Sequence, residues 1–128
     1  MKLTGVRIVV LIVALVLAIA HSLYARIIFR ALPLGAYFLV ATLLFLIGGL
    51  AGSLASGRLF RISNVGLMLL SLVDCSLIFY TRTFPTAFFG DRIVLWSTGW
   101  MPPGAVQVFV AQIIMIVVSG YALLRARA

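Results

Sequence analysis

Three polar side chains of this sequence could bind a proton, an ion or one another in apolar surroundings: Asp74, His21 and Gln112. Each lies well inside a long apolar stretch. A carboxylate at the centre of a membrane-spanning helix costs about 2.5–3.5 kcal/mol on insertion scales. We therefore expect Asp74 to be paired, protonated or turned toward protein or water. Helical spacing puts Ser71 on its face and Cys75 beside it.

The same three residues fall at one depth if their stretches are helices. At a rise of 1.5 Å per residue, Asp74 and Gln112 lie roughly 18 Å, and His21 roughly 20 Å, from one common side. We expect a shared polar layer. It could be a proton relay, an ion or substrate contact, or a site facing a partner's cofactor. It could instead be hydrogen bonding that fixes helix register, or three contacts to neighbouring subunits.

These polar residues lie within four apolar stretches of the sequence, each bounded by arginine. Crossing the hydrocarbon core takes about 20 apolar residues, and each stretch supplies roughly that many. Apolar residues make up 65% of the chain, against about 45–50% in soluble domains. The sequence therefore predicts an all-α fold: an integral membrane bundle of four transmembrane helices in a single membrane domain, 1–128. The predicted spans are 6–29, 34–56, 62–80 and 104–124, with a tight basic turn over 57–61.

Small residues recur every four positions along the second span. This spacing lets helix backbones approach closely, because lipid offers no hydrophobic drive for association. We expect two parallel packing ladders, against helices of this chain or of another. Their residues are Gly48, Gly52 and Ser56, then Gly49, Ser53 and Gly57.

The long connection 81–103 between the third and fourth spans is rich in aromatic residues. Aromatic side chains favour the headgroup level of a membrane. We expect an interfacial loop with Trp96 and Trp100 as interface anchors. The same loop could be a docking surface for another subunit.

The net charge of +8 does not indicate nucleic-acid binding, because the lysine and arginine residues sit at the ends of the apolar stretches. The expected acidic partner is anionic lipid. Four spans place both termini on one side. Counting basic residues gives six on that side against four on the other, which predicts a multi-pass protein of the cell membrane with cytoplasmic termini.

Sets of residues typical of catalysis are missing from the sequence. There are two acidic residues and one histidine, with no phosphate-binding loop and no nucleophile–histidine–acid arrangement. His21 alone supplies one ligand, so a haem would need a second from elsewhere. Cys75 is the single cysteine, which excludes an intrachain disulfide. We expect no catalytic, cofactor-binding or metal-binding residues, and no enzyme.

One half of the chain resembles a known family. The basic turn 58–61, the span segment 64–70, the loop Arg82-Thr83-Phe84-Pro85 and the apolar 107–124 ending in Arg125-Ala126-Arg127 are similar to the middle of branched-chain amino-acid ABC transporter permeases. This resemblance implies a role in membrane transport. No substrate-pathway residue can be carried over from it.

Two functions follow as expectations. The first is a small non-catalytic subunit that packs in and stabilises a larger membrane complex, such as a respiratory or other energy-converting assembly, with other membrane subunits as partners. The alternative is a small oligomeric transporter, channel or permease-like component. In that case His21, Asp74 and Gln112 would line its polar path.

Overall fold

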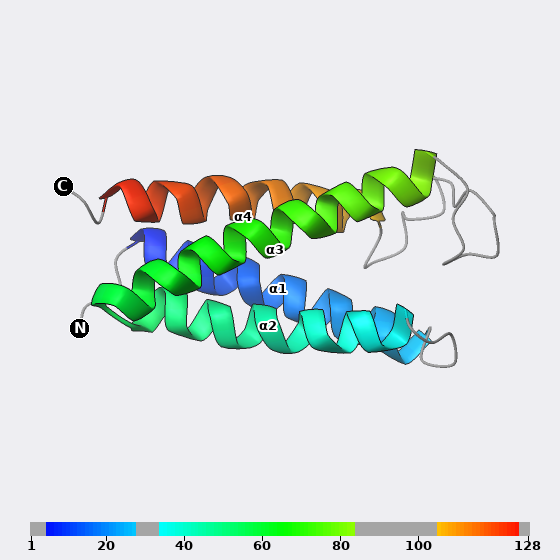
Figure 1. The fold of residues 1–128 in the computed structure, drawn as a ribbon, viewed down its shortest axis with the longest axis horizontal. Coiled ribbons are helices and arrows are strands. Elements are labelled where there is room, and N and C mark those ends of the chain that lie inside the picture. Colours follow the sequence, from blue (N-terminus) through cyan, green and yellow to red (C-terminus); the bar gives the residue numbers. More distant parts are fainter. Residues whose placement is uncertain (1–4, 28–33, 84–104, 126–128) are drawn as a thin grey trace.

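The computed structural model describes residues 5–27, 34–83 and 105–125, and nearly all of them are helical. Helices α1 and α2 cover Gly5–Ile27 and Leu34–Leu54, and α3 and α4 cover Gly57–Thr83 and Ala105–Arg125. The start of α1, the end of α4 and the turn between α2 and α3 lie together (Figure 1). We call this the terminal end of the bundle, and the opposite end the loop end.

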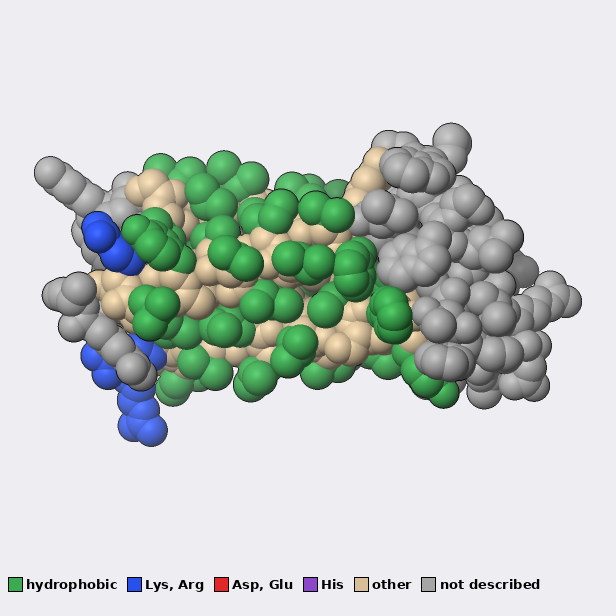
Figure 2. Space-filling view, turned by 90° about the horizontal axis from the view of Figure 1, so that it is seen from above, with side chains coloured by type: hydrophobic (Ala, Val, Ile, Leu, Met, Phe, Trp, Pro, Cys, Tyr) green, Lys and Arg blue, Asp and Glu red, His purple; other side chains and the backbone are tan. Residues whose placement is uncertain are grey.

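All four helices are long and apolar enough to cross a membrane. Helix α1 packs on α2 and α4, and α3 packs on α2 and α4, so the helices form a closed ring of neighbours. On the face shown in Figure 2, hydrophobic side chains cover the helices, and arginine side chains of the described residues lie at the terminal end. The predicted all-α bundle of four transmembrane helices is confirmed.

The predicted helix ends need correction around the second turn. Helix α2 ends at Leu54 and α3 already begins at Gly57, so the expected basic turn 57–61 is the first turn of α3. Only Ala55 and Ser56 are non-helical among the described residues. The reversal is this short because Gly57 has a φ of +61°, a left-handed conformation that glycine adopts without steric cost.

The other boundaries differ by a few residues. The first span, predicted as 6–29, is Gly5–Ile27, and residues 28 and 29 lie outside the described residues. The third span extends to Thr83, so 81–83 belong to a helix rather than to the loop. The fourth is Ala105–Arg125 instead of 104–124. The rest of the predicted interfacial loop, with Trp96 and Trp100, also lies outside the described residues.

Arg7 joins three helices at the terminal end. Its Nη1 donates hydrogen bonds to the carbonyl oxygens of Ser53 at 3.0 Å and Ala55 at 2.6 Å. Its guanidinium lies 4.3 Å from the centre of the Phe60 ring of α3. The last carbonyls of a helix have no partner within the helix and carry a partial negative charge. Arg7 from α1 therefore caps α2 and packs on α3.

The two small-residue ladders face two different helices of the same chain. A β-carbon on Gly48 would lie 3.0 Å from the Leu67 side chain of α3, and Gly52 also faces α3. A β-carbon on Gly49 would lie 2.4 Å from that of Ala14 in α1. Close approach here thus joins α2 to α1 and α3.

The last step of each predicted ladder is wrong. Ser56 and Gly57 lie beyond the end of α2 and are exposed. A β-carbon on Gly57 would meet nothing within 4 Å. Residues spaced four apart share one face only while the chain is helical, and α2 ends before Ser56 and Gly57. Ser53 remains on its ladder as a buried residue.

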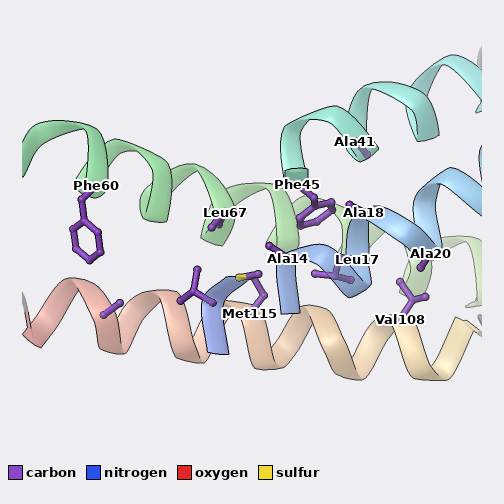
Figure 3. Close-up of a cluster of buried hydrophobic side chains, with 12 residues drawn as sticks. Ala14, Leu17, Ala18, Ala20, Ala41, Phe45, Phe60, Leu67, Val108 and Met115 are labelled. Atoms are coloured by element: carbon purple, nitrogen blue, oxygen red, sulfur yellow. The ribbon is translucent and has the colours of Figure 1, made fainter. Parts of the chain in front are cut away.

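The hydrophobic core lies along the axis of the ring (Figure 3). Leu17, Phe45, Leu67 and Met115 supply one large side chain from each helix, and each is at most 1% exposed. Toward the loop end from this layer lie the buried polar side chains of His21, Asp74 and Gln112.

Candidate functional site

The carboxylate of Asp74 accepts hydrogen bonds from residues of the three other helices. The hydroxyl of Tyr37 from α2 donates to Oδ1. The side-chain amide of Gln112 from α4 donates to Oδ2. His21 from α1 places its Nε2 2.5 Å from the same Oδ2. We call these four residues the Asp74 cluster; every helix of the bundle contributes one of them.

His21 is held at both ring nitrogens. Its Nδ1 lies 2.7 Å from the carbonyl oxygen of Leu17, one turn earlier in α1. The ring also packs against two aromatic rings of α2, with centroid distances of 5.1 Å to Phe45 and 5.9 Å to Phe38. His21 and Asp74 are only 1% and 2% exposed. The pair is therefore shielded from lipid by packing as well as by hydrogen bonding.

The structure brings together all three residues of the predicted polar layer. His21, Asp74 and Gln112 lie on three helices and share the Oδ2 atom of one carboxylate. Ser71 is also buried on the same face of α3, whereas Cys75 is only partly buried and its Sγ donates to the Leu72 carbonyl.

Tyr37 is the member that sequence reasoning missed. A tyrosine near the end of an apolar stretch is typical of the membrane interface, which conceals other roles. The depth of Tyr37 in the bundle could have indicated that it lies level with Asp74. Tyr37 and Asp74 each lie about 17 residues, roughly 26 Å, from the turn between α2 and α3. Two antiparallel helices joined by a short turn place such residues at one level.

Three buried polar atoms of the described residues have no hydrogen-bond partner there. They are Gln112 Oε1, Ser71 Oγ and Asn64 Oδ1. The other end of the Asn64 amide is satisfied, because Nδ2 donates to the carbonyls of Gly52 and Phe60 at 3.0 Å each. These unpaired atoms lie within the core, so they face other helices of the bundle rather than lipid.

An apolar groove of about 330 Å³ runs between α1 and α4 beside the cluster. Its walls come mainly from small and branched apolar side chains, among them Val16, Leu17, Ala20, Val108 and Ala111. Polar surface contributes little to this groove, so it fits hydrocarbon better than a polar ligand.

No group of three or more histidine, cysteine or acidic side chains among the described residues is placed to hold a metal ion. The Asp74 cluster contains a potential general acid or base, but both carboxylate oxygens of Asp74 are already engaged by other members of the cluster. A reacting group needs a site within hydrogen-bond reach of the catalytic atoms. Within the described part of the chain, the cluster can hold protons and join helices.

No family model, no curated protein and no solved structure matches this chain. The fold and the site therefore define its class by themselves. Four apolar spans around a polar centre make it a small multi-pass integral membrane protein.

Proposed function

We propose that this protein is a non-catalytic subunit that packs in and stabilises a larger membrane complex, such as a respiratory or other energy-converting assembly. The proposal rests on the contrast between the polar groups in the core of the bundle and the apolar side chains on its outer surface. The hydrogen-bonding side chains of the Asp74 cluster bond to one another in the core. Large apolar side chains cover the outer faces, with Ile12, Ile47 and Val117 between 54% and 64% exposed. Such a surface suits contact with other membrane helices and with lipid.

The partner surface falls on the outer faces of the bundle. Gly48, Gly49 and Gly52 already contact helices of the same chain, so they are not open to another subunit. Arg58, Arg61 and Arg125 are exposed at the terminal end, where they would meet anionic lipid headgroups. We extend the proposal to the cell membrane with cytoplasmic termini, on the distribution of basic residues.

Mild-detergent purification followed by mass spectrometry tests this proposal. We expect other membrane polypeptides to co-purify in fixed proportion. Tryptophan at one exposed position per helix, at Ile12, Ile47, Leu69 and Val117, then locates the contact. At least one variant should release the partner while its own thermal unfolding stays unchanged. A chain that purifies alone, or only with copies of itself, contradicts the proposal.

The Asp74 cluster supports a second candidate, a small transporter, channel or permease-like component. Ionisable groups inside membrane helices commonly mark ion or proton pathways. The resemblance of residues 58–127 to transporter permeases points the same way. Here Asp74→Asn should abolish flux of a proton or small solute in liposomes, while Asp91→Asn leaves flux intact. Flux that is equal in both variants and in the unmodified protein counts against this candidate.

A further inference from the structure

We propose that His21 and Asp74 together bind one proton, shared between Nε2 and Oδ2, and that this proton exchanges through Tyr37 with the loop end of the bundle. This site goes beyond the proposed function. It is a property of the chain itself, so it holds whether the chain works alone or within a complex.

The Leu17 carbonyl determines the protonation of the imidazole. A carbonyl oxygen can only accept a hydrogen bond. Since Nδ1 of His21 lies 2.7 Å from that oxygen, Nδ1 must carry a hydrogen. The state of the other nitrogen, Nε2, then depends only on its contact with Asp74.

At 2.5 Å, Nε2 and Oδ2 must have one hydrogen between them. Without a hydrogen, two lone pairs would face each other. With two, the hydrogens would collide. The hydrogen lies either on Nε2, giving imidazolium and carboxylate, or on Oδ2, giving imidazole and carboxylic acid. Both arrangements have zero net charge, the cheapest condition for an ionisable pair inside a membrane.

The surrounding donors favour the first arrangement. Tyr37 donates to Oδ1 and Gln112 to Oδ2, and with the hydrogen on Nε2 both carboxylate oxygens are free to accept these hydrogen bonds. The described titratable groups at this level are His21 of α1, Tyr37 of α2, and Asp74 and Cys75 of α3. Helix α4 contributes Gln112, which does not titrate.

Large apolar side chains fill the core between the site and the terminal end. Leu17, Phe45, Leu67 and Met115 form a layer of large apolar side chains on that side, each at most 1% exposed (Figure 3). Tyr37 is the half-buried member of the cluster and lies one turn from the start of α2, at the loop end. Its hydroxyl is therefore the route by which the proton can leave.

The exchange step conserves protons at Tyr37. The shared proton moves from Nε2 to Asp74, which becomes a carboxylic acid. The carboxyl group then turns so that its proton faces the Tyr37 oxygen, and the Tyr37 hydroxyl turns its own hydrogen away from Asp74. The Tyr37 oxygen accepts the carboxyl proton as Tyr37 releases its hydroxyl proton to a water molecule. Tyr37 ends neutral, the pair has lost one proton, and the reverse sequence restores it.

The single histidine makes the shared proton measurable. In full-length protein labelled with ¹⁵N-histidine and placed in liposomes, one imidazole gives all the signal. We expect Nδ1 to be protonated and Nε2 to be strongly hydrogen-bonded across neutral pH. Asp74→Asn should move Nε2 to the range of an unprotonated nitrogen, whereas Asp91→Asn should leave it in place. An unprotonated Nδ1 in the unmodified protein overturns the proposal without any variant.

Hydrogen exchange of the shared proton with water tests the route. We expect Tyr37→Phe to slow this exchange by roughly 10²-fold, the lower end of what a positioned proton-transfer group contributes. Tyr121→Phe, on the outer face of α4, and Ser71→Ala, on the terminal side of Asp74, should leave it unchanged. If Ser71→Ala slows exchange and Tyr37→Phe does not, access is from the terminal end and the proposed route is wrong.

Discussion

A β-carbon on Gly49 would lie 2.4 Å from the β-carbon of Ala14, so α1 and α2 approach too closely here for any larger residue. Real β-carbons do not come this near, and backbone must shift to relieve the contact. The two helices meet at this point because both residues are small. The approach also brings Arg7, two turns earlier in α1, to the end of α2.

Replacing Gly49 by alanine should therefore lower stability. Overpacking of a well-filled core costs roughly 1–3 kcal/mol. The matched control is Gly66→Ala, since a β-carbon on Gly66 meets nothing within 4 Å. That variant should be neutral or gain up to about 1 kcal/mol from helix propensity. Thermal unfolding in detergent, followed by circular dichroism, measures both; equal midpoints for the two variants would falsify the close contact.

Asp74→Asn should destabilise the bundle although it keeps the size of the side chain. Three groups point at this carboxylate, and asparagine would direct its own NH₂ at one of them. A buried donor left unsatisfied costs roughly 1–3 kcal/mol. Asp91→Asn makes the same charge change at the only other acidic residue of the sequence. The midpoint of Asp74→Asn should fall well below that of Asp91→Asn, and no difference would mean that the cluster contributes little to stability.

Arg7→Lys should weaken the terminal end. An ammonium group cannot reproduce the planar contact with Phe60 while bonding two carbonyls. We expect a loss of roughly 0.5–1 kcal/mol from the weakened contact with Phe60, because lysine keeps the positive charge at the helix end. Arg58→Lys, at an exposed position of α3, serves as the control. Amide hydrogen exchange should rise in the last turn of α2 for Arg7→Lys alone; uniform protection in both variants would argue against the cap.

Ser71→Ala should leave stability unchanged or raise it slightly. The Ser71 hydroxyl is buried without a partner among the described residues, so its removal costs no hydrogen bond there. Ser53→Ala is the comparison, because that hydroxyl donates to the Gly49 carbonyl at 2.6 Å. It should lose about 1 kcal/mol. A larger loss for Ser71→Ala than for Ser53→Ala would reveal a partner of the Ser71 hydroxyl.

The membrane bundle and most of its polar layer could be predicted from the amino-acid sequence. Hydropathy is a sum of local transfer free energies, so four apolar stretches predict four spans without knowledge of any contact. The depth of a residue in the membrane also follows from its position along its helix, because the rise per residue is constant. His21, Asp74 and Gln112 could therefore be assigned to one level from their positions in the chain. The small residues of α2 likewise predicted close approach.

Which side chains contact one another depends on how the four helices pack. The rotation of each helix and the order of helices around the ring come from packing between residues distant in sequence. They turn Tyr37 toward Asp74, and Gly48 and Gly49 toward different helices. They also place Arg7 on the end of α2, a contact between residues 46 and 48 positions apart. The mean hydropathy of a span does not tell how the helix is rotated about its axis. For this reason Arg7, which the sequence placed among the charges at the lipid headgroups, could not be recognised as the cap of α2.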